Sequence, residues 1–441
     1  MLARGLQKYH AKLCKNLSKL LTKSSFIEPY CFDKKHFSRK RKLPFQTVTP
    51  IILQLLKSSV KSELKSFYAT IFKVDQVVNW VSDGSFCKAR QKIRYHLFID
   101  LYKHIVRQIY TQTGVKRWFH FRLLAVDGSE LNLPSSKELL KKYGHHHTNS
   151  IGTKIPQART SFLVDVLNNI TVDAQIESFK TSEQQMLMPQ LECTGKGDLL
   201  TADCNYGHFW ILKKALGKKA DFCIRMSLVS NVVKDFLASG EKDIVMDWVP
   251  SPKTRENCIK NDVDRNPMKV RLVRVELPGG NTEVLVTSLC KQDKYTFKDI
   301  MDLYGLRWGA EEEIKKYMQR LMVEFFSSIK QNGILQDFYA NVFMLNLVSF
   351  LAIPVKEEIH ASSCHCKYLQ QINWSSAIND ARKRLALLFL RSVKEISLII
   401  ESIWKPFKIN TEAIKPGRRF PRDKRKKGSR KKAFIQYKPA F

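Results

Sequence analysis

The stretch RLLAVDG, from Arg122 to Gly128, is a short apolar run that leads directly into an aspartate, Asp127. Apolar runs of this length beside a turn residue are typical of buried strands. A second run of the same kind, GDLLTADCNYG, places Asp203 directly after its apolar residues. Ligands of open α/β sheets gather near strand ends, so both aspartates are candidate site residues. For either aspartate alone, an ordinary turn or helix N-cap is the better explanation of the pattern.

The segments around these two runs predict a mixed α/β sheet covered by helices. Two strand-like runs, ARTSFLVDVL and NITVDAQIES, flank an Asn168–Asn169 pair, which is a hairpin signal. The pattern continues with a short helix at SEQQMLMPQL, a helix at HFWILKKALGKK and a strand at ADFCIRMS.

Changes of composition divide the chain into six predicted parts. We expect a helical, DNA-binding domain over 1–120, the first part of the α/β domain over 121–227, a β-rich insertion over 228–295, the remainder of the α/β domain over 296–360, a helical region over 361–414 and a basic tail over 415–441. The basic helix at SDGSFCKARQKI, 82–93, fits a DNA-binding module and a solvated helix face equally well. The insertion carries a predicted hairpin around PGGN at 278–281.

Positive charge is the strongest compositional signal. The 441 residues contain 75 Lys and Arg against 41 Asp and Glu, for a net charge of +34. An excess of this size indicates a polyanionic partner, most often nucleic acid. The tail at 415–432 is extremely basic and is expected to lie along phosphates, although it would also serve simply to increase solubility.

Three observations favour a cytoplasmic, nucleoid-associated protein without a membrane partner. The N-terminal segment lacks the apolar run and cleavage pattern of a signal peptide. The most apolar stretch, 338–355, is interrupted by Asn341 and Asn346, so we expect a buried core helix rather than a membrane span. The ten cysteines have no repeating spacing, as in proteins whose thiols stay reduced.

A third acidic segment is YGLRWGAEEEIKKYMQR, 304–320, within a strongly helical region. On a continuous helix, spacings of three and four place the residues of one column on a shared face; the column is Tyr304, Arg307, Glu311 and Lys315. Glu312 and Glu313 are expected to face solvent. The alternative is an amphipathic helix with ordinary ion pairs, which the Glu311–Lys315 spacing also fits.

Three carboxylates from separate elements, Asp127, Asp203 and Glu311, are enough to hold two Mg²⁺ ions, with Mn²⁺ as a substitute, because magnesium prefers oxygen ligands and retains several waters. Two such ions can activate a water or a 3′-hydroxyl for in-line attack on phosphorus. The planar fork of Arg307 is then suited to grip a phosphate, and Tyr304 to donate a hydrogen bond to one.

The sequence resembles the DDE transposases of bacterial insertion sequences, in the subgroup with a Y-x2-R-x3-E-x6-K signature. The spacing of YGLRWGAE matches that signature, LLAVDGSELNLP resembles the first-aspartate block, and LLTADCNYGHFWILKKALGKKADFCIR resembles the second. The helix VEFFSSIKQNGILQDFYANVFMLNL and the basic C-terminus are also similar, so the resemblance runs from about Phe86 to the end.

This resemblance implies a ribonuclease-H-like catalytic domain with a β-rich insertion, acting in cut-and-paste transposition. It implies that Asp127, Asp203 and Glu311 are catalytic metal ligands and that Tyr304 and Arg307 contact the DNA backbone. The expected partners are double-stranded DNA, as terminal inverted repeats and as target, and a second protomer in a dimer on DNA. The signature lysine position is occupied by Met318, and Lys315, one turn earlier, is the substitute for DNA contact.

Two other classes of function remain open at this point. One is a related nuclease, or a catalytically impaired or domesticated DNA-binding descendant. The other is a basic structural or RNA-binding protein, which the strand-end acids disfavour because carboxylates repel phosphate unless a metal intervenes.

Overall fold

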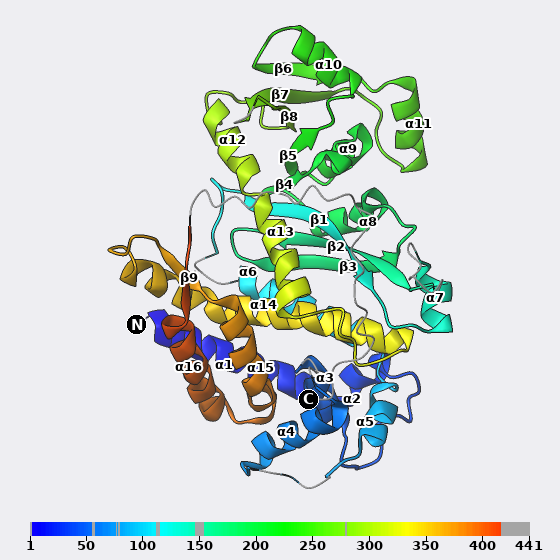
Figure 1. Ribbon diagram of the computed structural model, residues 1–441, viewed down its shortest axis with the longest axis vertical. Helices are drawn as coiled ribbons and strands as arrows, with labels where there is room; N and C mark the ends of the chain where they lie inside the picture. Colours follow the sequence, from blue (N-terminus) through cyan, green and yellow to red (C-terminus); the bar gives the residue numbers. More distant parts are fainter. Residues whose placement is uncertain are drawn as a thin grey trace. The chain divides into compact units, whose positions relative to one another are not determined.

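A computed structural model describes residues 2–54, 58–75, 77, 80–111, 115–145, 154–277 and 280–415 (Figure 1). The chain divides into two compact units. The helical unit consists of Met1–Gly114, Asn132–Gln157 and Lys316–Phe441, and the sheet unit consists of Val115–Leu131 and Ala158–Lys315. The predicted basic tail lies outside the described residues, apart from Lys415.

The sheet unit is built on an eight-stranded mixed sheet, which confirms the predicted α/β, ribonuclease-H-like fold. Its strand order is β3-β2-β1-β4-β5-β8-β7-β6. The three central strands β1, β4 and β5 are parallel, whereas β2 with β3, and β5 with β8, β7 and β6 in turn, are antiparallel. The strands are β1 (Arg122–Asn132), β2 (Gln157–Asp165), β3 (Ile170–Ser178), β4 (Asp198–Ala202), β5 (Asp221–Met226), β6 (Asp243–Trp248), β7 (Met268–Glu276) and β8 (Thr282–Thr287).

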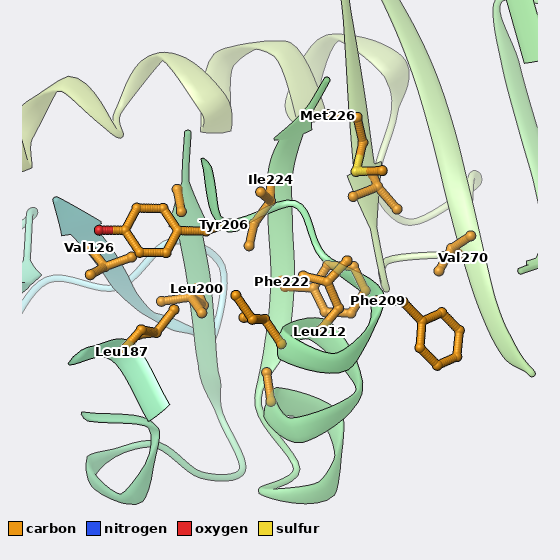
Figure 2. Close-up of a cluster of buried hydrophobic side chains, with 14 of the residues drawn as sticks. Val126, Leu187, Leu200, Tyr206, Phe209, Leu212, Phe222, Ile224, Met226 and Val270 are labelled. Carbon is orange, nitrogen blue, oxygen red and sulfur yellow. The ribbon is translucent and has the colours of Figure 1, made fainter. Parts of the chain in front are cut away.

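Helices cover both faces of this sheet, because successive strand side chains point to opposite sides. Leu124, Leu200 and Phe222 join the cluster formed with α8 and α9, which Figure 2 shows in part. Leu123 and Leu199 join the cluster formed with α12 on the other face. The helices of this unit are α8 (Glu183–Gln190), α9 (Phe209–Gly217), α10 (Asn231–Ala238), α11 (Pro252–Lys260), α12 (Phe297–Gly305) and α13 (Trp308–Lys315), with short 3-10 turns at Leu191–Cys193 and Cys204–Tyr206.

The predicted β-rich insertion is part of the main sheet. Strand β8 pairs with β5, and β7 and β6 follow it to the edge. The predicted β7–β8 hairpin is confirmed, while residues 278–279 of its turn lie outside the described residues. The hairpin predicted at Asn168–Asn169 is also confirmed, since β2 and β3 pair antiparallel around it.

The helical unit joins helices from the beginning and the end of the chain. They are α1 (Leu2–Leu20), α2 (Ser24–Ile27), α3 (Phe45–Leu53), α4 (Val60–Phe72), α5 (Asp83–Arg90), α6 (His96–Tyr110), α7 (Lys137–Tyr143), α14 (Gln331–Ser362), α15 (Trp374–Leu390) and α16 (Val393–Ile409). A 3-10 turn at Glu28–Tyr30, a π-helical turn at Lys316–Arg320 and the short strands β9 (Gln370–Ile372) and β10 (Thr411–Ala413) complete it.

Helix α14 is the central element of the helical unit and packs against α3, α6, α15 and α16. It is long and apolar enough to cross a membrane by length and composition, but 94% of its most apolar window is buried inside the protein. This burial is what was expected of a core helix.

A buried arginine ties α5 to α14 within the helical unit. Arg90 donates from Nε to the side chain of Gln336 at 3.0 Å and from Nη1 to Ser327 Oγ at 2.6 Å. Its Nη2 donates to the Gly333 carbonyl at 3.2 Å and pairs with Asp337 at 3.1 Å. Each nitrogen of this guanidinium therefore has an acceptor inside the protein.

Candidate active site

Asp127 lies on β1, beyond the part of the strand that pairs with β4, which ends at Ala125. The strand itself continues to Asn132, so Asp127 ends the parallel pairing rather than the strand. The alternation along β1 places Asp127 on the α12 side of the sheet, because Val126 belongs to the α8 and α9 cluster. Its carboxylate is half-buried and accepts the Gly128 N–H at 2.8 Å.

Asp203 follows β4 directly and lies at the same end of the sheet, because β1 and β4 are parallel. It is also the N-cap of a 3-10 turn, and its side chain accepts the Asn205 N–H at 2.9 Å. Both sequence interpretations of this aspartate, strand end and turn cap, therefore hold. The cap fixes the carboxylate at the sheet edge.

The helical segment that carries Glu311 is broken. A capping box between Thr296 and Asp299 starts α12 as predicted, but α12 ends at Gly305 and α13 begins at Trp308. Arg307 lies in the break and is buried, and its Nη2 pairs with Glu311 Oε1 at 2.9 Å.

The remaining members of the predicted column are placed differently. Tyr304 is buried in the α12 cluster, and its ring lies 5.7 Å from the Arg307 guanidinium. Lys315 is exposed and pairs with Glu312 at 2.5 Å, rather than with Glu311. Glu312 is exposed as expected, whereas Glu313 is buried, so its predicted exposure is wrong. The side of α13 that carries Glu313 is packed against protein.

The charges show that the three predicted carboxylates are neighbours. Burial raises the pKa of Asp127 to about 6, and the negative charges of Glu311 and Asp203 act in the same direction. The Gly128 N–H and the Arg307 guanidinium oppose this rise of the pKa. The fold thus brings together three carboxylates that are remote in sequence, with Arg307 as a counter-charge beside them.

Two polar atoms beside these carboxylates have no hydrogen-bond partner among the described residues: the Tyr304 hydroxyl and Arg307 Nε, both buried. Burial raises the pKa of Tyr304 to about 12, so its hydroxyl carries a proton at neutral pH. Buried donors without a partner are costly, and they are common where a ligand supplies the acceptor.

The donor set suits a hard divalent cation, because every candidate ligand is a carboxylate oxygen in a half-buried, negatively charged site. Among the described residues, no three His, Cys, Asp or Glu side chains are already arranged around a common metal position. Arg307 and backbone N–H groups occupy the carboxylates instead.

One further carboxylate at this edge of the sheet, Glu183, was not predicted from the sequence. It is the first residue of α8, after the N-cap Ser182, and it is half-buried. Its Oε1 lies 2.7 Å from the position that a Cβ on Gly128 would take. The available signal was an acid at the start of the helix that precedes the second-aspartate strand, but helix starts carry acids routinely.

The family model described as the transposase DDE domain matches residues 118–347, which include all three predicted carboxylates. The chain belongs to the DDE transposase family. As such it is a DNA transposase, as the sequence resemblance implied, and the family typically uses a divalent metal.

A comparison with solved structures finds a likeness of this transposase to the piggyBac transposase in its synaptic complex with hairpin DNA. The identity is 12% and the TM-score 0.46, over 89% of this chain and 81% of that one. No curated protein matches the sequence.

Proposed function

We propose that this transposase cuts its element out of DNA and joins it to a target, with Asp127, Asp203 and Glu311 holding two divalent cations. Mg²⁺ is the expected ion, and Mn²⁺ the expected substitute. The observation that carries the proposal is that these three carboxylates, from β1, the turn after β4 and α13, lie close enough for Asp127 to respond to both of the others. When bound, the cations supply activation of a water or 3′-hydroxyl and stabilisation of the leaving oxygen.

The residues of the chain itself account for DNA positioning. Arg307 is held in place by Glu311 and retains an unpartnered Nε, which suits a second acceptor such as a phosphate oxygen. The unpartnered hydroxyl of Tyr304 lies beside it and is suited to donate to the same group. Both side chains are buried, so they are held in a fixed orientation before DNA arrives.

The proposed partners are the element's terminal inverted repeats and target DNA, bound by a dimer in the cytoplasm at the nucleoid. The net charge of +34 supports a polyanionic partner. Lys315 is the proposed replacement for the signature lysine, because it is exposed and one turn before Met318.

A second candidate is a DNA-binding descendant with impaired cleavage, and Met318 at the signature lysine position favours it. The two candidates differ in a single measurable property. Both bind the terminal repeats, but only the active transposase cleaves at the repeat boundary.

The test uses the full chain, Mg²⁺ and DNA that carries the element's terminal inverted repeats. We expect cleavage at the repeat boundary, and a loss of at least about 10³-fold in Asp127→Asn, Asp203→Asn and Glu311→Gln, with DNA affinity largely retained. Glu312→Gln, an exposed glutamate on the same helix, is the matched control and should cleave normally. Binding without cleavage by the unaltered chain would select the impaired descendant.

A further inference from the structure

Glu183 approaches the sheet edge from the face opposite to Glu311. Along β1, the Asp127 side chain points to the α12 side, so a side chain at position 128 would point to the α8 side. The 2.7 Å spacing between Glu183 Oε1 and a Cβ on Gly128 shows that the carboxylate tip occupies the space where any other residue would have a side chain. Glycine at 128 therefore allows Glu183 to lie one residue from Asp127.

The helix that carries Glu183 is fixed to the turn that carries Asp203. Gln184 Nε2 donates to the Asn205 carbonyl at 2.8 Å, two residues after Asp203. Ser182 and Gln185, on either side of Glu183 and Gln184 in the sequence, form a complete capping box that sets the start of α8. These contacts fix the start of α8, and with it the backbone of Glu183, beside the turn that carries Asp203.

A buried tyrosine hydroxyl points into the same space. Tyr206 is 1% exposed, and its hydroxyl has no hydrogen-bond partner among the described residues. Burial raises the pKa of Tyr206 well above its ordinary value, and the charges of Glu183, Asp127 and Asp203 add to the effect. Figure 2 shows the hydroxyl pointing away from the Leu212 and Phe222 part of the core. The hydroxyl therefore faces the carboxylates of the site, and the Glu183 charge has the largest effect of the three on its pKa.

Pairwise charge effects link these carboxylates. Asp127 responds to Glu311 and Asp203, and Glu183 responds to Asp203 after the effect of its own burial, which raises its pKa. Arg159 lies beside Glu183 and lowers that pKa, but Arg159 also donates to the Thr181 carbonyl. Asp203 is thus the carboxylate whose charge acts on both Asp127 and Glu183.

We propose that Glu183 is a fourth carboxylate ligand of the divalent-cation site, binding the ion on the Asp203 side, with the Tyr206 hydroxyl positioning its free oxygen. This inference rests on the proposed function, since it assigns one more ligand to the same site. Magnesium fills its coordination sphere with oxygen ligands from protein, water and phosphate, and Glu183 would supply one more protein oxygen from the opposite face of the sheet.

The experiment measures Mn²⁺ binding by electron paramagnetic resonance, using the full chain bound to terminal-repeat DNA. For Glu183→Gln we expect one of two ions to bind about 10- to 100-fold more weakly, with the other unchanged. Tyr206→Phe removes only the hydroxyl and should give a smaller effect in the same direction. Glu177→Gln, an exposed glutamate on β3, controls for the loss of one negative charge.

A second variant guards against misfolding. Glu183→Asp keeps the charge but shortens the side chain, and it should give an intermediate Mn²⁺ affinity. Unchanged Mn²⁺ binding in Glu183→Gln, beside a clear loss in Asp127→Asn and Asp203→Asn, would overturn the assignment of Glu183 alone. If these two aspartate variants also bound Mn²⁺ normally, the proposed function itself would fail.

Discussion

Two buried arginines in this protein each pair with a carboxylate, but they differ in whether every guanidinium nitrogen has a hydrogen-bond acceptor. Arg90, in the helical unit, is 3% exposed, and each of its nitrogens has an acceptor. Arg307, in the sheet unit, is 5% exposed, pairs with Glu311 and leaves its Nε without a partner among the described residues. The arrangement around Arg90 is closed, in the sense that every donor is used. The arrangement around Arg307 can still donate to a hydrogen-bond acceptor from a bound ligand.

The difference separates stability from function. A guanidinium with all its donors satisfied contributes to the fold, and removing it leaves buried acceptors unpaired. A buried guanidinium with an unused donor is a cost to the folded protein until a ligand arrives, which is common in functional sites. The first arginine should therefore matter for unfolding and the second for DNA cleavage.

The largest expected effect is on stability. Arg90→Ala should lower the free energy of unfolding by about 3–5 kcal/mol, because the Asp337 carboxylate is left buried without its guanidinium partner. Urea unfolding followed by circular dichroism measures the loss. The double variant Arg90→Met, Asp337→Leu should recover much of it, and a loss below about 1 kcal/mol in Arg90→Ala would break the comparison.

The second effect is on catalysis. Arg307→Lys keeps the charge but removes the planar fork, so terminal-repeat cleavage should fall about 100-fold, or about 2.7 kcal/mol of activation free energy. The free energy of unfolding should change far less than in Arg90→Ala. Single-turnover cleavage at saturating DNA is the measurement, and a rate equal to that of the unaltered chain would show that the fork is not used.

The third expected effect is a gain of stability on substitution, whereas most substitutions lower the free energy of unfolding. A carboxyl whose folded-state pKa is raised to about 6 holds its proton more tightly than in the unfolded chain. Ionisation of Asp127 therefore lowers the free energy of unfolding as pH rises from about 4 through 6, and the full decrease is present above that range. Asp127→Asn should raise the free energy of unfolding at pH 8 by about 1–2 kcal/mol, after discounting for solvent screening.

This gain should shrink to a few tenths of a kcal/mol at about pH 4, because the folded chain then holds the proton and the unfolded chain is about half protonated. Urea unfolding at pH 4 and pH 8 in the presence of a chelator checks the sign. Asp337→Asn, in the closed arrangement of the helical unit, is the opposing control and should destabilise at pH 8. An equal gain for Asp127→Asn at both pH values would trace it to packing rather than to charge.

The smallest effect concerns the exposed pair Lys315–Glu312. Lys315→Ala should change the free energy of unfolding by less than about 0.5 kcal/mol, because exposed ion pairs contribute little. If Lys315 contacts a phosphate, the variant should also reduce the salt dependence of DNA binding by about one charge. Lys298→Ala, which breaks an exposed pair with Asp302 on α12, is the matched control, and an equal reduction there would remove Lys315 from the DNA surface.

Local sequence signals were enough for the central part of the fold. The apolar runs before Asp127 and Asp203, the Asn168–Asn169 hairpin and the Thr296–Asp299 capping box all depend on residues close in the chain. The meeting of three remote carboxylates was a hypothesis from two strand ends and a helix, which the family resemblance supported, because spacing along the chain does not fix distances between elements.

Features that depend on long-range packing were not predictable. Glu313 reads as part of an exposed acidic run but is buried, and the break at Arg307 interrupts a helix whose periodicity looks continuous. Glu183 looked like an ordinary helix start, since its meaning depends on Gly128, which is 55 positions earlier in the chain. The pairing of β8 with β5 likewise depends on contacts across more than 50 residues.

The pairing of β8 with β5 limits how far the chain can be shortened. Cutting out the segment that holds β6, β7 and β8 would leave β5 with a bare row of backbone N–H and C=O groups and with Phe222 and Ile224 beside it. Uncovered edges of this kind recruit strands from other molecules and lead to aggregation. A minimal nuclease core made by that excision should therefore precipitate, and any shortened version must keep β8 or blunt β5 with charged residues.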